Sequence, residues 1–99
     1  MRPPPLSPEL LLLHPKDNVV LVKRTIAAGT ELIIDGRIVL APKDLPMGHK
    51  LARFDIAKNQ PVFKYGFKIG LSDTNIAVGN HVHLHNLRSE YTIIEDMSA

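Results

Sequence analysis

The stretch TIAAGTELIIDGRIVLA, residues 25–41, combines a tight turn with a β-hairpin. Asp35-Gly36 separates the apolar runs LII and RIVL, and a two-residue type I′ turn needs positive φ at both central positions, which this pair tolerates. The preceding segment, TIAAGTEL, contains a small polar residue, an aliphatic anchor, a glycine and a second aliphatic residue. These residues predict short strands joined by tight turns.

The turn pattern that starts at Thr25 recurs along the chain. Its four copies are TIAAGTEL from Thr25, DLPMGHKL from Asp44, DIAKNQPV from Asp55 and NIAVGNHV from Asn75. The first residue of each can accept a local backbone hydrogen bond, the Ile or Leu can anchor the turn in the core, and Gly or Asn tolerates a left-handed conformation. Uneven spacing of the copies argues against a solenoid. We predict a mainly β domain of short crossing strands and hairpins with little helix.

Composition restricts the class of protein. A chain of 99 residues and 11.0 kDa can form one small core, but that core cannot by itself enclose a deep active site. The formal charge of +2 is spread among acids and aromatic residues make up 5%, so we expect no nucleic-acid binding. The absence of cysteine excludes disulfides and thiolate metal sites. The apolar run at 10–13 is too short for a bilayer span, so we expect a cytoplasmic protein without membrane contact.

Proline content and the turn copies divide the chain into three parts. We assign residues 1–9 to a flexible Pro-rich tail, because four prolines remove backbone donors and favour extended conformations. Residues 10–89 form the domain. Residues 90–99 are a C-terminal tail or the start of a linker.

The stretch HVHLHN, residues 81–86, places three of the chain's five histidines at alternate positions. On a strand, His81, His83 and His85 would line one face and the apolar residues between them the other. Two imidazoles two residues apart can converge on one metal ion. The first and third lie roughly 13 Å apart at about 3.3 Å per residue, so all three would need a bulge to bind one ion. The alternatives are a metal or substrate site and a solvated face of an edge strand.

Two further segments carry basic residues. His49 and Lys50 follow Gly48 in the second turn copy, where glycine allows a ligand to approach the backbone, although an ordinary surface loop can hold the same residues. Lys64 belongs to PVFKYGFKIG, residues 61–70, in which alternation favours a core face. That face would hold Phe63, Tyr65, Phe67 and Ile69. Lys64 would then point away from the core and be either solvated or paired with an anion.

The segment HPKDN contains His14, Asp17 and Asn18 just before the apolar run VVLV. We interpret it as a capping and turn cluster.

With these residues in view, the chain resembles the SAF-type N-terminal domain of the altronate/galactarate dehydratase family, which includes small subunits of two-chain lyases such as sulfolactate sulfo-lyase. The matching stretches, which together cover about residues 14–89, are DNVVLV, GTEL, GHKLARFDIA, PVFKYGFKIG, IAVGNHVHLHN and LRS. Their order, with HVHxHN closing the domain, is the specific feature. Asn59-Gln60 departs from the glycine usual in relatives, but Asn also accepts positive φ, so we expect the turn to survive.

The resemblance implies a β-clip fold beside a large catalytic subunit or domain that removes water from anionic sugar acids. It also implies a divalent metal, iron(II) or manganese(II), held mainly by that partner. We therefore expect three catalytic residues, namely His49, Lys50 and His83. The expected substrate-binding residues are Lys64, Asn86 and Arg88, and the expected metal ligands are His81, His83 and His85.

The isolated chain is accordingly expected to be inactive. The alternatives that remain are the small subunit of a sulfolactate sulfo-lyase, a carbohydrate-binding or regulatory module without chemistry, and a scaffold that stabilises a homo-oligomer.

Overall fold

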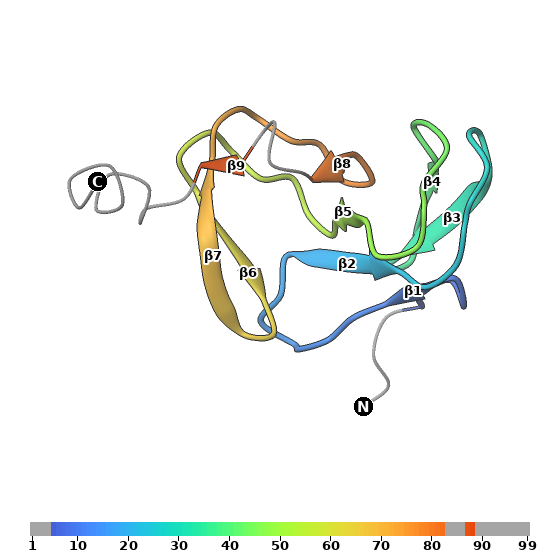
Figure 1. The fold of residues 1–99 in the computed structure, drawn as a ribbon, viewed down its shortest axis with the longest axis horizontal. Helices are drawn as coiled ribbons and strands as arrows, with labels where there is room; N and C mark the ends of the chain where they lie inside the picture. The colour runs from blue at the N-terminus through green and yellow to red at the C-terminus, as the bar shows by residue number, and fades with distance from the viewer. Residues whose placement is uncertain (1–4, 83–86, 89–99) are drawn as a thin grey trace.

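The computed structural model describes residues 5–82 and 87–88, which form short antiparallel strands and no helix (Figure 1). The strands are β1 (Leu10–Leu11), β2 (Val19–Val22), β3 (Glu31–Ile34), β4 (Arg37–Leu40), β5 (Lys50–Ala52), β6 (Pro61–Lys64), β7 (Phe67–Ser72), β8 (His81–Val82) and β9 (Leu87–Arg88). A sheet in the order β1-β2-β5-β8 lies between the β3–β4 hairpin and the β6-β7-β9 sheet (Figure 1). The predicted all-β class is confirmed. Within the described ranges, no helical segment has the length and apolar character of a membrane span.

The domain consists of two halves with the same order of strand, turn, hairpin and turn, and β5 both closes the first half and opens the second. In each half the two turn copies pair through an antiparallel bridge, Ile26 with Leu45 and Ile56 with Ile76. All four of these side chains are at most 3% exposed. The predicted role of the Ile or Leu as a core anchor is therefore confirmed in every copy.

Each turn has the left-handed residue that the pattern predicts. The residues with positive φ, between 70° and 92°, are Gly29, Gly48, Asn59 and Gly79. The next residue donates its N–H to the carbonyl three positions earlier, as Asn80 does to Ala77 at 3.0 Å. A positive φ at the third turn position is the mark of a type II β-turn. The Asn59 turn survives, as expected.

In the second, third and fourth copies the first polar residue of the turn bonds to the partner turn and not, as predicted, within its own. Asp55 Oδ1 accepts the Val78 N–H at 2.9 Å, and Asn75 Oδ1 accepts the Lys58 N–H at 2.8 Å. The prediction was wrong because the bridge between the two turns brings each side-chain oxygen close to the other turn's backbone N–H. The polar residue therefore fixes how two turns pair.

Each half has its own buried cluster. The first cluster contains the strand residues Leu32, Ile34 and Leu51, and the second contains Val62 and Val82, all at most 1% exposed. Burial alternates along β3, as expected for a strand with one face in the core.

The N-terminal segment also contributes to the first half. Leu6 bridges Ile34, and the Ser7 N–H donates to the Ile33 carbonyl at 2.9 Å. Ser7 is 8% exposed. Pairing with β3 thus begins within the part of the chain that we assigned to the tail.

The segment PVFKYGFKIG is a second hairpin and not a continuous strand. Tyr65 and Gly66, with φ of 57° and 77°, form its turn, as Asp35 and Gly36 do in the first hairpin with 49° and 82°. Tyr65 and Phe67 are consequently 56% and 74% exposed, so the predicted aromatic core face is wrong. The signal was hidden because tyrosine is an unusual residue for positive φ.

Asp17 stabilises that unusual turn. The residue is 1% exposed, and its carboxylate accepts the Tyr65 N–H at 2.9 Å and the Gly66 N–H at 2.7 Å. The His14 ring lies against Gly66, where a β-carbon would be 3.1 Å away, and the Asn18 side chain bonds to the β6 backbone. The HPKDN segment is thus a turn cluster, as interpreted from the sequence.

Arg53 connects the two hairpin turns. Its Nε donates to Asp35 Oδ2 at 2.7 Å, and its Nη1 donates to the Pro15 and Asp17 carbonyls at 3.0 Å. The first hairpin's turn is therefore tied to the loop that caps the second.

Replacing Asp17 with alanine should lower the free energy of unfolding by about 3 kcal/mol, because the N–H groups of Tyr65 and Gly66 lose the charged acceptor that the buried Asp17 side chain provides. Asp17→Asn retains one acceptor oxygen and should lower the free energy of unfolding by a smaller amount. Urea denaturation measures both. The exposed carboxylate of Glu31 on β3 provides the control, since Glu31→Ala should change stability by less than about 0.5 kcal/mol. Equal stability of the Ala variants at 17 and 31 would contradict the capping role.

Gly48→Ala and Gly79→Ala should differ in cost, although φ is positive at both residues. A β-carbon at Gly79 would lie 2.9 Å from Val39, whereas at Gly48 no atom lies within 4 Å. Backbone strain is common to both, so the additional loss for Gly79→Ala, about 1–3 kcal/mol, measures overpacking against β4. Thermal unfolding of the two variants gives the comparison, and equal losses would show that Val39 moves aside freely.

Candidate functional site

Two of the predicted residues, His49 and His81, meet where the halves join. His49 precedes β5 and His81 begins β8, and these strands pair with Leu51 opposite His81. His49 Nδ1 lies 2.7 Å from His81 Nε2, and the rings stack with 4.8 Å between their centroids and 13° between their planes. One nitrogen must donate and the other accept, so the two rings share a single proton between these atoms.

The fold does not require an imidazole at position 49. The Val22 N–H donates to the His49 carbonyl at 2.8 Å, and in the second half the Ala52 N–H donates to the Asn80 carbonyl at 2.9 Å. The two residues occupy equivalent places, and only their backbone atoms maintain the turn. The His49 side chain is therefore available for chemistry.

Lys50 and Lys64 add positive charge on the other face of β5. Lys50 is opposite Val82 and His81 is opposite Leu51, so Lys50 and His81 project from opposite faces of the sheet. Burial lowers the pKa of the Lys50 amino group, and the positive charge of Lys64 lowers that pKa further. Lys64 ends β6, with its Nζ 5.4 Å from the centre of the Tyr65 ring. An anion bound between the two amino groups would relieve their repulsion, so this part of the surface favours a carboxylate.

The remaining predicted residues lie at the edge of the described structure or beyond it. His83, His85 and Asn86 are outside the described residues. Arg88 lies in β9, opposite Leu71 of β7. The alternation predicted for this strand holds at its start, where Val82 is 1% exposed and His81 is half-buried.

The described donors do not fit a metal ion. Within residues 5–82 and 87–88 no three His, Asp or Glu side chains are grouped to hold one. Two imidazole nitrogens bound to a single ion at about 2.1 Å would stand more than about 2.9 Å apart. The 2.7 Å between His49 and His81 is the length of a hydrogen bond instead. His81 Nε2 is thus engaged by His49 in this arrangement.

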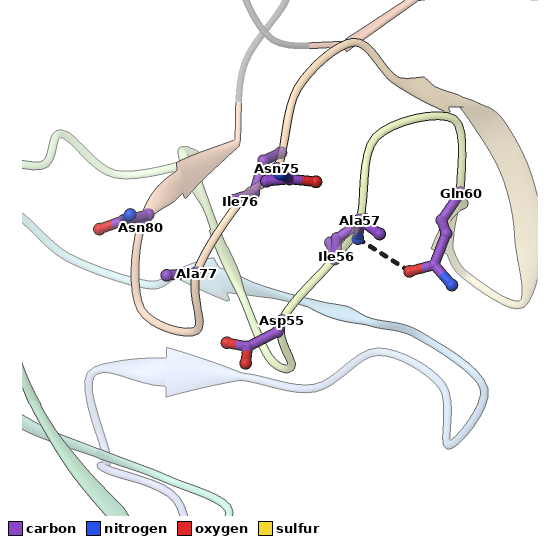
Figure 2. Close-up of a pocket in the computed structure, with 8 residues that line it drawn as sticks. All are labelled: Asp55, Ile56, Ala57, Gln60, Asn75, Ile76, Ala77 and Asn80. Carbon is purple, nitrogen blue, oxygen red and sulfur yellow. Dashed lines mark hydrogen bonds between the residues drawn. The ribbon is translucent and has the colours of Figure 1, made fainter.

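A cleft of about 420 Å³ opens between the third and fourth turn copies (Figure 2). It is lined by Asp55, Ile56, Ala57, Gln60, Asn75, Ile76, Ala77 and Asn80. Its carboxylate and two of its amide oxygens already bond to turn N–H groups, including Gln60 Oε1 with Ala57 at 2.8 Å. No described residue of the predicted site lines it. We therefore place the candidate site at the His49–His81 pair and the Lys50–Lys64 pair, which lie on the two faces of β5, and not in this cleft.

The contact between His49 and His81 was not predicted. His49 was expected to act with His83 and His85, because alternation along one strand was the only geometric rule applied to the histidines, and that rule does not describe contacts between strands. The signal that would have found the pair is the alignment of the second and fourth turns, GHKL and GNHV, which places both histidines beside neighbouring strands.

Comparisons with known proteins agree with the fold. A sequence model described as the altronate/galactarate dehydratase SAF domain matches residues 8–90. Altronate dehydratase of Escherichia coli (strain K12) is 39% identical over 87 residues, which are 88% of this chain and 18% of that protein. Altronate dehydratase of Bacillus subtilis (strain 168) is 36% identical over 83 residues, 84% of this chain and 17% of that protein. The chain thus spans less than a fifth of these relatives.

A second kind of relative is shorter. (2R)-sulfolactate sulfo-lyase subunit alpha of Chromohalobacter salexigens is 44% identical over 46 residues, which are 46% of this chain and 49% of that subunit.

Lys64→Gln should raise the pKa of Lys50, because it removes the neighbouring positive charge. The folded state disfavours the charged form of the Lys50 amino group, so its folded pKa lies below its unfolded pKa. The charged amino group therefore lowers the stability of the protein at every pH below the folded pKa. This loss of stability decreases as the pH rises from the folded pKa towards the unfolded pKa. Lys64→Gln should therefore stabilise the protein slightly at neutral pH. An NMR titration of the lysine side chains gives the pKa, and Lys43→Gln, on an exposed loop, is the control. A Lys50 pKa that does not change in the Lys64 variant would contradict the coupling.

Proposed function

The chain belongs to the altronate/galactarate dehydratase SAF domain family, and we propose that it is the small subunit or domain of a sugar-acid hydro-lyase that works with a large catalytic chain. Support comes from the lengths of the relatives: the altronate dehydratases are more than five times as long as their matching part. The sulfo-lyase relatives are named as alpha subunits. A domain of this size needs a second surface to enclose a substrate.

His49 and Lys50, which follow Gly48, carry the proposal together with Lys64, whose charge acts on Lys50. Elimination from a sugar acid needs a base for the proton next to the carboxylate, stabilisation of the enediolate and a proton for the departing hydroxide. His49 can move a proton near neutral pH, while Lys50 and Lys64 can hold the substrate carboxylate. No atom lies within 4 Å of a β-carbon built at Gly48, so a substrate or partner can approach the backbone there.

We infer that a divalent metal, iron(II) or manganese(II), is held mainly by the large chain, since the described donors of this chain do not fit one. When bound, such an ion would supply Lewis-acid stabilisation of negative charge. This chain would contribute proton transfer at His49 and charge pairing at the two lysines. His83 and His85 are proposed to face the same site, with Asn86 and Arg88 as weaker substrate contacts.

A sulfo-lyase subunit is the second candidate. The observation that favours it is the 44% identity to a sulfolactate sulfo-lyase subunit alpha over about half of that subunit. The same basic residues would suit that reaction, because both the substrate and the departing sulfite are anions.

Reconstitution tests the proposal. The tagged full chain is purified from its own cells, the large chain that accompanies it is identified by mass spectrometry, and each chain and the complex are assayed with altronate, galactarate and sulfolactate. We expect turnover only from the complex, and the preferred substrate distinguishes the two candidates. Lyase turnover by the 99 residues alone would refute the shared site.

His49→Ala should lower kcat of the complex by roughly 100-fold, the usual size of a lost proton-transfer group. His83→Ala and His85→Ala should reduce turnover by a similar factor. Asn80→Ala changes the equivalent turn position in the second half and should leave kcat unchanged. An unaltered rate in the histidine variants, with normal thermal unfolding, would return these residues to an ordinary polar surface.

A further inference from the structure

The β3–β4 hairpin has an exposed apolar outer face. We define this outer face as Ile33, Ile38 and Leu40, which are 37%, 65% and 63% exposed. Ile33 pairs directly with Ile38, so the two side chains lie together on the surface. The opposite face of β3 carries the buried Leu32 and Ile34. The hairpin is therefore apolar on both faces, although only one of them enters the core.

The second hairpin shows that the fold does not require an apolar outer face. Its register places Lys68 opposite Phe63, where the first hairpin has Ile38 opposite Ile33. Leu71, opposite Pro61, corresponds to Leu40, opposite Glu31. Leu71 is half-buried, and the chain's own β9 pairs with β7 at this residue. The position equivalent to Ile38 is thus charged, and at the position equivalent to Leu40 the strand is paired with β9.

Among the described residues β4 has no such cover, because its sheet contains only β3 and β4, and the N-terminal segment pairs with β3 through Leu6 and Ser7. The Ala41 N–H donates to the Thr30 carbonyl at 2.8 Å, and hydrogen-bonded pairs alternate along an antiparallel ladder. The backbone groups of Ile38 and Leu40 consequently face the outer edge of β4. An edge strand with exposed apolar side chains pairs with another polypeptide unless it is protected.

We propose that the large lyase chain docks on this outer face, laying a segment along β4 as β9 lies along β7. The inference rests on the proposed function. The large chain is the favoured occupant because the matching part of the altronate dehydratases is 18% of a much longer polypeptide. Position also favours it: the turn after β4 carries Met47, 71% exposed, beside Gly48 and His49. A chain that covers β4 therefore lies next to the candidate site.

The test uses the purified complex of the full chain with its large partner. The variant Ile38→Lys/Leu40→Lys introduces at position 38 the residue type that Lys68 provides in the second hairpin. We expect the affinity for the large chain, measured by biolayer interferometry, to fall at least about tenfold, since two lysines in an apolar interface would be buried as unpaired charges. Leu11→Lys is the matched control, because Leu11 is an exposed leucine, 40%, on β1 and outside the outer face. It should change affinity by less than about twofold.

Hydrogen exchange provides a second measurement on unmodified protein. The amides of Ile38 and Leu40 should exchange more slowly in the complex than in the free chain, while those of β1 should not change. Circular dichroism and the urea midpoint of the double variant should match the wild type, because both side chains are exposed.

Four results would overturn the inference. An active complex that binds the double variant as tightly as the wild type would exclude this face while leaving the proposed function intact. Slowed exchange confined to other strands would do the same. A free chain that light scattering shows to be a dimer, and that the double variant converts to a monomer, would assign the face to a second copy. A failure to find any lyase chain would instead reject the proposed function and this inference together.

Discussion

The docking of each turn onto a strand end is the interaction on which the rest of the structure depends. The left-handed residue of the turn donates its N–H to the carbonyl of a residue at the strand end. The same strand-end residue donates its own N–H to the carbonyl of the next turn residue. Gly79 and Asn80 bond in this way to Ala52, and Gly48 and His49 to Val22, at 2.8–2.9 Å. Only a residue that accepts positive φ can direct its own N–H and the carbonyl of the following residue to the same strand-end residue. The turn pairs, with Ile or Leu anchors beneath them, then hold the hairpins in place.

This constraint explains why the candidate site lies at β5. The strand closes the first half and opens the second, so the second turn enters it at His49, and β8, which follows the fourth turn, pairs beside it. The arrangement brings an imidazole from each half into contact without a long loop. Two half-buried rings on backbone-bonded segments are held with little freedom, which suits the proton transfer that we propose for His49.

The sequence predicted the parts of the fold that local chemistry determines. The turn anchors, the Asp35-Gly36 hairpin and the positive φ at Asn59 follow from residue type and spacing. The second hairpin was missed because its turn contains Tyr65, whose conformation depends on Asp17, 48 residues away. The cross-turn bond of Asp55 was missed for the same reason. Both depend on contacts that form only after distant segments have come together.

The two-half architecture separates residues that maintain the fold from residues that serve another purpose. A position at which both halves carry the same chemistry, such as Ile26 and Ile56, is needed for folding. Where equivalent positions differ, the fold tolerates either residue, so the difference needs another cause. His49 against Asn80 and Ile38 against Lys68 are two such differences.

The two differences are of distinct kinds. A proton-carrying side chain replaces an amide in the first, and an apolar surface replaces a charge in the second. Lysine at 68 shows that a strand in this place can be solvated, so burial in the domain's own core does not explain Ile38. A partner that covers β4 does explain it, and the same partner would close the space beside the turn that carries His49. Under the two proposals, catalytic assistance by His49 and assembly through β4 would draw on neighbouring surfaces.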